Sequence, residues 1–599
     1  MEQIQKYRIP NSIIDDIFYW YRHKEIAIPE IQRPFVWDAT QVRDLFDSLY
    51  QGYPIGYLIL WKNPNVKLKD GRTSEGKKIL IDGQQRIMSL ITAILGDEIV
   101  NKNYKKQRII ISFNPQTEKF EVFNPAIAKD PSWITDIGPI IRNDVGLIES
   151  IEAYLTRNPS ADKKHVENTL ERLRNITRIP IGLIELSHDL DIETVTEIFI
   201  RINSKGNPLN QADFAMSKIA ANENYNGPLL RKCIDYFCHA AVSPEFIDDI
   251  RQNDTDFVQS EFFDKIEWLK KETDDLFDPG YTDLLRVAFT LEFNRGKLAD
   301  LVSLLSGRNF ETKTYEEDIV KDSFDKLKKG ILEFINETNF KRFIMIIKSA
   351  GFITPDMIRS RNVLNFAYIL YLKLRALNYN PADIEKYVRK WFVLSILTER
   401  YSGSPETLFD FDIRKITSQR FEDLLKDVES AELSDAFWNS GLVQSLKTPV
   451  VSSPYFNVYL AAQVKSNDKG FLSKDITVKD LIQQRGDVHH IFPKEYLKAN
   501  GLKRGDYNQI ANLCYTQSEI NIKINDSSPK EYLSVVFKQC EGGELIYGGI
   551  NNIDILKQNL KENCIPEETK EMEFEQYQEF LEKRRVLIAK KIKDYYYSL

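Results

Sequence analysis

The chain has 599 residues, too many for one hydrophobic core, so roughly two to four domains are expected. Apolar residues make up 42% and charged residues 28%, as in ordinary globular domains, and no run approaches the roughly 20 apolar residues of a membrane span. The net charge of −7 excludes a protein whose whole surface is basic, but it is compatible with a local positively charged surface that binds phosphates.

The N-terminal residues and the cysteines indicate in which cellular compartment the protein is expected. Met1–Lys6 lacks the basic start and apolar run of a secretory signal, so we expect a cytosolic protein that does not cross a membrane. The five cysteines are odd in number and include no CxxC pair. Buried thiols are therefore expected, not disulfides or a cysteine zinc site.

The first 125 residues alternate helical and extended patterns, which predicts a small α/β domain. The expected helices cover residues 12–21, 40–50 and 84–95, and the expected strands cover 26–31, 57–61, 78–81 and 108–113.

A polar string follows the expected strand at 78–81. It reads Asp82-Gly83-Gln84-Gln85-Arg86 and leads through an Asp-Gly turn into a helix. The start of a helix presents unpaired backbone N–H groups to which a phosphate can bind, and Arg86 could clamp that phosphate. The alternative is a helix that is simply capped by Asp82.

Two further strings carry polar groups beside turns. Residues 28–37 place Gln32 and Arg33 next to an aromatic pair, Phe35 and Trp37, which suits a nucleotide or equally a hydrophobic core. Residues 199–209 hold Asn203 beside a glycine turn.

Together the three strings resemble the DUF262 domain, which is related to the ParB and sulfiredoxin nucleotide-binding fold. The resemblance covers about residues 8–215 and implies binding and hydrolysis of a nucleoside triphosphate, GTP or ATP. The nucleotide-binding residues that it implies are Asp82, Gly83, Gln84, Gln85 and Arg86, with Gln32, Arg33 and Asn203 nearby.

From about residue 145 to 445 the apolar spacing is mainly helical, so the middle of the chain is expected to be α-helical. The pattern breaks into turn residues at Asn467–Gly470, and a separate catalytic domain is expected to follow. Six cations in 583–593 could contact a nucleic-acid backbone, although a solvated helix face is the alternative.

Two histidines stand side by side in this last part, within Asp487-Val488-His489-His490-Ile491-Phe492-Pro493. In an extended segment neighbouring side chains point to opposite faces, so one imidazole can bind a metal while the other faces a substrate phosphorus. Asn512 and Asn521 follow, in the order strand, loop and helix of a ββα-metal finger. A coincidental histidine pair is the alternative.

Residues 475–545 resemble the HNH nuclease domain of the DUF1524 family. The resemblance implies that His490 is the general base and His489 a metal ligand, that Asn512 orients the base, and that Asn521 is the second metal ligand. Many relatives carry Asp or Glu where this chain has His489, which leaves Asp487 as a rival ligand.

The combination resembles the GmrSD-type, modification-dependent (type IV) restriction enzymes and their single-chain relatives in phage defence. We therefore expect a multidomain α+β protein with a ParB-like α/β domain (1–215), an α-helical connecting region (216–465) and an HNH nuclease domain (466–599). The expected function is nucleotide-regulated cleavage of phage or modified DNA with Mg²⁺ or Mn²⁺, and a homo-oligomer is compatible with the sequence. The alternatives are a nucleotide-dependent DNA-binding sensor that does not cut and an RNA-cutting toxin.

Overall fold

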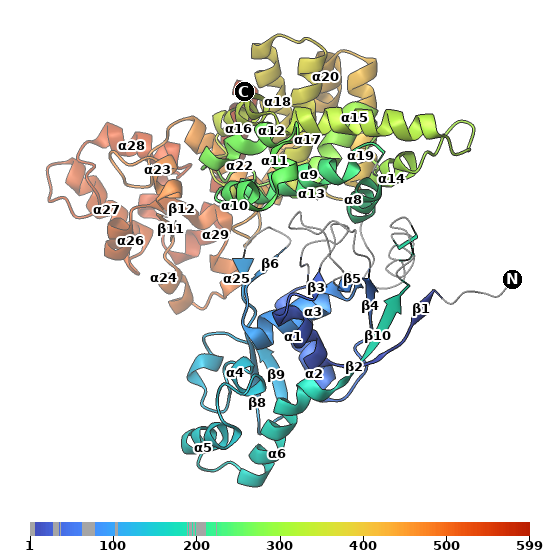
Figure 1. Ribbon diagram of the computed structural model, residues 1–599. Helices are drawn as coiled ribbons and strands as arrows, with labels where there is room; N and C mark the ends of the chain where they lie inside the picture. Colours follow the sequence, from blue (N-terminus) through green and yellow to red (C-terminus); the bar gives the residue numbers. More distant parts are fainter. Residues whose placement is uncertain are drawn as a thin grey trace. The chain divides into compact units, whose positions relative to one another are not determined.

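The computed structural model describes residues 6–27, 35, 37–62, 78–101, 106–187, 190, 194–195, 198, 211–222, 224–484 and 486–599. The chain divides into two compact units. Figure 1 labels the helices and strands of both. The N-terminal unit consists of Met1–Thr273, Pro279–Thr282 and Leu301–Phe324, and the C-terminal unit consists of Asp274–Asp278, Asp283–Asp300 and Asp325–Leu599. The helical stretch between the two ends of the chain is thus shared by both units.

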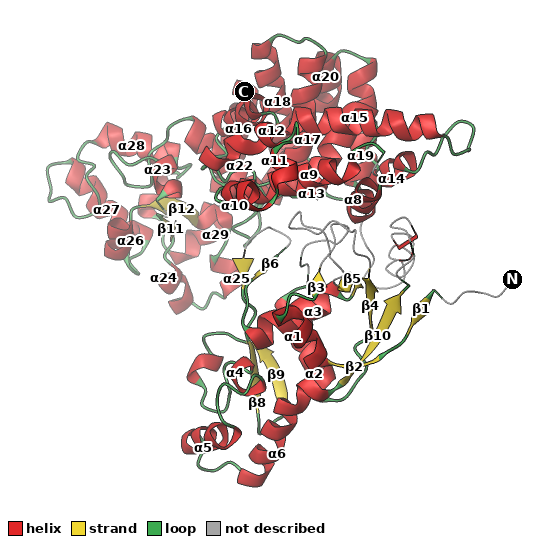
Figure 2. Ribbon diagram, viewed as in Figure 1, coloured by secondary structure: helices red, strands yellow, loops and turns green. Residues whose placement is uncertain are grey.

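The N-terminal unit is built on a mixed sheet, drawn as yellow arrows in Figure 2. Its order is β1-β10-β4-β5-β3, and β2 also pairs with β10. β4 is parallel to β10 and antiparallel to β5, while β3 and β5 are parallel. The strands are β1 (Tyr7–Arg8), β2 (Asn11–Ile13), β3 (Ile26–Ala27), β4 (Tyr57–Lys62), β5 (Lys78–Asp82) and β10 (Pro180–Leu186).

Both faces of the central strands are buried. Leu58 and Leu60 of β4 join a core with α1 (Ile14–Arg22), α2 (Ala39–Tyr50) and α3 (Gln84–Leu90). Ile59 and Trp61 point the other way and join a second apolar cluster. Because successive side chains alternate between faces, a strand covered on both sides is a continuous apolar run, as the segment Tyr57–Trp61 is in the sequence.

The rest of the N-terminal unit extends this core. A hairpin of β8 (Ile111–Asn114) and β9 (Lys119–Val122) packs its Phe113 and Phe120 rings together, with centroids 4.8 Å apart. The further helices include α4 (Gly138–Ile141), α5 (Leu147–Arg157), α6 (Lys163–Arg174), α8 (Gln211–Ala221), α9 (Gly227–Val242) and α10 (Phe246–Asn253).

The C-terminal unit begins with a helical assembly around α17 (Arg361–Ala376), of which most side chains are buried. Its neighbour α18 (Pro381–Leu397) starts with an Asn380 cap and a proline in the first turn, a typical helix start. The helices packed with them include α13 (Tyr281–Phe293), α16 (Glu337–Ser349), α19 (Pro405–Ser418), α20 (Phe421–Glu432) and α22 (Pro454–Lys465). The expected helical middle is confirmed.

The last part of the C-terminal unit holds a two-stranded sheet within helices. β11 (Asp487–His490) pairs antiparallel with β12 (Leu513–Thr516), and α26 (Ser518–Ile524) follows directly. Between the strands the chain forms α24 (Lys494–Ala499) and α25 (Arg504–Tyr507). The closing helices are α27 (Pro529–Cys540), α28 (Ile553–Glu562) and α29 (Tyr577–Ser598).

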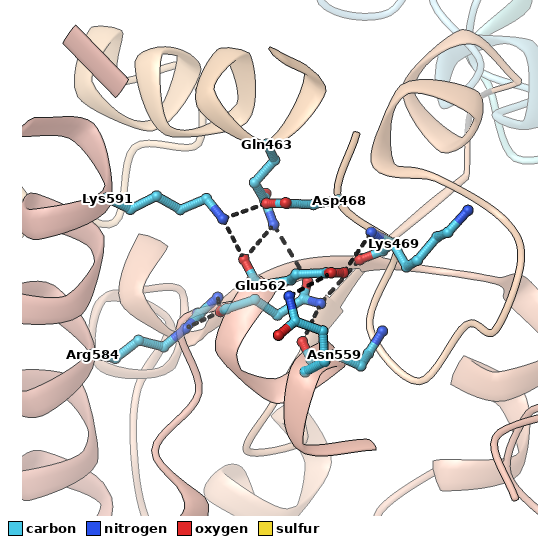
Figure 3. Close-up of polar contacts among 9 residues, drawn as sticks. Gln463, Asp468, Lys469, Asn559, Glu562, Arg584 and Lys591 are labelled. Atoms are coloured by element: carbon cyan, nitrogen blue, oxygen red, sulfur yellow. Dashed lines mark hydrogen bonds and ion pairs between the residues drawn. The ribbon is translucent and has the colours of Figure 1, made fainter. Parts of the chain in front are cut away.

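Cations of α29 hold this part of the chain together (Figure 3). Arg584 is fully buried and donates to the carbonyl oxygen of Asn563 at 3.1 Å. Lys591 pairs with the buried Asp468 and donates to the carbonyl oxygen of Glu562 at 2.9 Å. Lys583 also pairs with carboxylates, and so does Lys593. The basic run at 583–593 is therefore largely engaged in internal contacts.

Most elements expected near the N-terminus agree with the structure, but the helix expected at 12–21 begins only at Ile14, after strand β2, and the strand expected at 108–113 begins only at Ile111. The helix expected at 84–95 is α3 followed by a π-helical turn, Ile91–Leu95. Of the strand expected at 26–31, only Ile26–Ala27 lies within the described residues. The fold is mixed α/β and mostly helical, with a small N-terminal sheet, as expected. Among the described helices, none has the length and apolar character that spanning a membrane requires.

Candidate functional site

The pairing of β11 with β12 sends the two adjacent histidines to opposite faces of the strand. His489 is 3% exposed and stacks on Phe471, with ring centroids 5.9 Å apart. His490 lies instead against Tyr507, whose ring meets the imidazole edge-on at 6.2 Å. Strand geometry thus gives two neighbouring imidazoles separate surroundings, as the sequence pattern predicts.

The His490 imidazole is held by Asn508. Its Nε2 lies 2.9 Å from Asn508 Oδ1, and because an amide oxygen only accepts, Nε2 carries the proton and Nδ1 keeps a lone pair. Burial lowers the pKa of His490 below its ordinary value, and the nearby charge of Lys494 lowers it further. A neutral imidazole with one free lone pair is suited to accept a proton.

His489, Asn521 and Asp487 form a hydrogen-bonded chain. His489 Nδ1 donates to Asn521 Oδ1 at 2.6 Å, and Asn521 Nδ2 donates to Asp487 Oδ2 at 3.2 Å. Asp487 and His489 are two residues apart on β11 and therefore face the same side, toward α26. Burial lowers the pKa of His489 to about 4, so this imidazole is neutral at pH 7.

The chemistry of these three side chains fits a divalent cation. A neutral imidazole, an amide oxygen and a carboxylate are all ligands that Mg²⁺ or Mn²⁺ accepts in proteins. Nδ1 of His489 is the ring nitrogen that faces Asn521, so Nδ1 would be the ligand atom for an ion shared with Asn521, and the imidazole proton would then sit on Nε2, which is buried with no hydrogen-bond partner among the described residues. Three or more His, Cys, Asp or Glu side chains are nowhere grouped for metal binding in the described ranges, so an ion here would draw on Asn521 as well as on the histidine and the aspartate.

Asn512 acts on the main chain and makes no direct hydrogen bond to the His490 imidazole. The Phe492 amide donates to its Oδ1 at 2.8 Å, and its Nδ2 donates to the carbonyl oxygens of Phe492 at 3.0 Å and Tyr507 at 3.1 Å. It therefore fixes the turn that follows His490. The direct imidazole contact comes from Asn508, four residues before Asn512, and its role was not predicted from the sequence.

Buried groups from α27 and α29 support this turn. Arg584 donates to the carbonyl oxygens of Ala511 at 2.9 Å and Leu513 at 2.8 Å, on either side of Asn512. Tyr532 donates its hydroxyl to the carbonyl oxygen of Ile491 at 2.8 Å. The backbone on both sides of the candidate base is thus anchored by side chains that are themselves buried.

The second candidate site lies at the end of β5 in the N-terminal unit. Asp82 ends the strand, and Gly83 adopts a left-handed conformation with φ of 96° at the start of α3. A Cβ at Gly83 would meet Leu58 Cδ2 at 2.2 Å, so glycine is required by space as well as by φ. Among the described residues no side chain caps α3, and the Asp82 carboxylate instead accepts from the Arg86 guanidinium, so Asp82 is not the cap that the alternative expected.

The side chains of this string are partly engaged. Arg86 donates to Asp82 Oδ2 at 2.9 Å and to the carbonyl oxygen of Ile55 at 2.8 Å. Gln85 Oε1 accepts from the Trp37 amide at 3.2 Å, which joins two of the three strings. Gln84 is buried, and its Oε1 has no hydrogen-bond partner among the described residues.

These features fit a bound nucleotide. The partial positive charge at the start of α3 suits a phosphate, and a donor on a ligand would satisfy the Oε1 of Gln84. Gln32, Arg33 and Asn203 lie outside the described residues.

Comparison with known proteins identifies the N-terminal part. Residues 14–220 match the family model described as GmrSD restriction endonuclease, N-terminal domain. The uncharacterized protein MJ0686 of Methanocaldococcus jannaschii is 23% identical over 626 aligned residues, which cover 95% of this chain and 96% of that protein. The expected resemblance to GmrSD-type enzymes is confirmed for this part of the chain, because residues 14–220 match the model of the N-terminal domain of that restriction endonuclease family.

Proposed function

We propose that this protein is a metal-dependent DNA endonuclease of the HNH type that acts in restriction-type phage defence under the control of a nucleotide. The observation that carries the proposal is that His489 and His490 point to opposite faces of β11 and have different hydrogen-bond partners. His489 lies with Asn521 and Asp487 as candidate metal ligands, and His490 has an Nε2–H fixed by Asn508 and an Nδ1 without a hydrogen-bond partner among the described residues. The match of residues 14–220 to a restriction endonuclease domain supports it independently.

The proposed reaction assigns one role to each side chain. His490 Nδ1 takes a proton from the water whose oxygen attacks the phosphorus, while Nε2–H stays bonded to Asn508. Asn512 keeps the turn after His490 in place through its contacts with Phe492. Mg²⁺ or Mn²⁺, held by His489, Asn521 and Asp487, would stabilise negative charge on the scissile phosphate and the leaving oxygen.

The N-terminal unit is proposed to regulate cutting. Its string Asp82–Arg86 would bind the phosphates of GTP or ATP at the start of α3, with Gln32, Arg33 and Asn203 as further ligand contacts. Nucleotide binding or turnover there would gate cleavage of phage or modified DNA by the C-terminal unit.

The test is a cleavage assay with the full chain. Wild type and His490→Ala are incubated with unmodified and modified phage DNA, with Mg²⁺ or Mn²⁺ and with or without ATP or GTP. His23→Ala is the matched control, because this exposed histidine bonds only within its own helix among the described residues. Metal-dependent cutting that His490→Ala abolishes and His23→Ala preserves would support the proposal.

Two results would overturn it. Cutting retained by a folded His490→Ala chain would remove His490 as the base. No cutting under any condition, with DNA binding retained, would instead favour a sensor that does not cleave. A matched RNA substrate in the same assay distinguishes a DNA nuclease from an RNA nuclease, because this chemistry attacks phosphorus without reading the 2′-hydroxyl.

A further inference from the structure

The chain between the two strands of the candidate nuclease site is locally basic. Residues 494–507, here called the basic insertion, comprise α24, α25 and the turn that joins them. They contain four cations and two carboxylates, a net charge of +2 in a chain whose net charge is −7. These cations are Lys494, Lys498, Lys503 and Arg504.

The basic insertion is anchored by its apolar side chains and presents its cations to solvent. Leu497 and Tyr507 are buried in the core of this part of the chain, and Leu502 packs against the same core. All four cations are exposed. A rigid base with charged groups outward is what a binding surface for a polyanion requires.

Two of the four cations have no ion-pair partner among the described residues. Lys498 pairs with Glu495 at 2.9 Å, and Lys494 lies 3.7 Å from the same carboxylate. For Lys503 and Arg504, no carboxylate lies within ion-pair distance in the part of the chain that the structure describes. This differs from α29, where Lys583, Lys591 and Lys593 are paired.

The C-terminal end of the basic insertion meets the His490 imidazole, and the charge of Lys494 at its other end is close enough to lower the pKa of His490. Its last residue, Tyr507, contacts the ring, and the next residue, Asn508, bonds Nε2. Lys494 begins the insertion four residues after His490. Arg504 stands four residues before Asn508, which corresponds to about 6 Å along a helix axis. Two successive steps along one DNA strand rise roughly 7 Å, so the two lengths are similar.

We propose that the basic insertion binds the phosphate backbone of the DNA strand that His490 attacks. Lys494 contacts the phosphate nearest the scissile bond, and Lys503 and Arg504 contact neighbouring phosphates. This inference rests on the proposed nuclease function, because the basic insertion is proposed to bind DNA at the nuclease active site. It gives the acidic protein the local positive surface that binding of nucleic acid requires.

The test measures DNA binding as a function of salt. Fluorescence anisotropy follows a labelled duplex binding to the full chain in EDTA, for wild type and for K503Q/R504Q. The matched control is K386Q/K426Q, which removes two exposed lysines of α18 and α20 that have no ion pair in the described ranges. Both variants change the net charge equally, and thermal unfolding checks that each is folded.

We expect K503Q/R504Q to bind DNA more weakly than wild type. Its salt slope, which is the change in log affinity with log salt concentration, should be smaller by about 1.8, because each lost phosphate contact on B-DNA lowers the slope by about 0.9. K386Q/K426Q should keep the wild-type slope. Equal slopes for all three proteins would overturn the inference. The inference would also be overturned if K503Q/R504Q lost affinity for a labelled acidic peptide while its affinity for DNA stayed unchanged.

The cleavage assay separates failure of this inference from failure of the proposed function. Cutting that depends on His490, with an unchanged slope in K503Q/R504Q, rejects the basic insertion alone. A reduced slope without any cutting keeps the DNA-binding surface and rejects the nuclease.

Discussion

The two candidate sites differ in what holds their polar side chains in place. In the C-terminal unit, His490 and His489 bond to asparagines, and buried groups such as Arg584 anchor the surrounding backbone. In the N-terminal unit, Arg86 bonds to Asp82 within the same short string and to the carbonyl oxygen of Ile55. Side chains of α27 and α29 thus brace the first site, whereas the contacts described for the second come from its own turn, from Ile55 and from Trp37, so the same kind of substitution should affect them unequally.

The largest effect is expected at Arg584. Arg584→Ala leaves the carbonyl oxygens of Ala511, Leu513 and Asn563 without their buried donor and opens a cavity. We expect a loss of about 3–5 kcal/mol in the free energy of unfolding. Hydrogen exchange with peptide-level mass spectrometry should show lost protection in β11, β12 and α26, with β4 and β5 unchanged.

A neighbour on the same helix provides the control. Lys583 is exposed and pairs only with surface carboxylates, so Lys583→Gln should cost less than about 1 kcal/mol. Equal loss of protection in both variants would show that Arg584 is not a special support of the site.

The second prediction concerns acid. His489 has a pKa of about 4 in the folded chain against 6.5 ordinarily, so between these values the unfolded chain binds a proton that the folded chain does not. Stability is therefore lost as pH falls from 6.5 to 4, by about 3 kcal/mol over the whole window. Urea unfolding of wild type and His489→Gln between pH 7 and pH 4, followed by peptide-level hydrogen exchange, measures this contribution.

The comparison between variants is needed because other groups titrate in the same range. Burial raises the pKa of Asp468 to about 6, which has the opposite sign and favours folding as pH falls. His239 in the N-terminal unit is also buried, with a pKa of about 4, and stays unchanged in both proteins. If His489→Gln loses as much stability in acid as wild type, His489 does not carry the effect.

The third prediction concerns Asn508. Asn508→Ala removes the acceptor that fixes the Nε2–H tautomer of His490, so cleavage should fall about 10- to 100-fold, in kcat more than in KM. Asn508→Asp keeps an acceptor and should retain more activity than Asn508→Ala. Equal activity of wild type and Asn508→Ala would mean that the amide does not position the base.

The sequence predicted the parts of both sites that depend on local geometry. Alternation along a strand was enough to send His489 and His490 to opposite faces, and the Asp82-Gly83 turn was readable because glycine permits a left-handed φ. Asn508 was missed because its contact with His490 depends on how α24 and α25 fold back, and no spacing rule encodes that. Arg584 was grouped with the other cations of 583–593 as a candidate for nucleic-acid contact, because the sequence does not show which face of the helix is buried. In the structure Arg584 is fully buried.

The smallest effect is expected at Arg86, in the less braced site. Of the five guanidinium N–H groups, two bond to Asp82 and Ile55, and the other three have no partner among the described residues that would compete with a ligand phosphate. Arg86→Ala should weaken binding of GTP or ATP about tenfold, the effect of one charge-assisted hydrogen bond. Isothermal titration calorimetry with each nucleotide measures it.

Arg86→Lys is the informative control for the Arg86 prediction. Lysine keeps the charge but cannot bridge Asp82 and Ile55 as a planar guanidinium does. If charge alone attracts the phosphate, Arg86→Lys binds nucleotide nearly as well as wild type. If the guanidinium acts mainly by shaping the turn at Gly83, Arg86→Lys and Arg86→Ala lose affinity equally. Unchanged nucleotide affinity in both variants would reject the phosphate clamp and leave Arg86 as a support of its own turn.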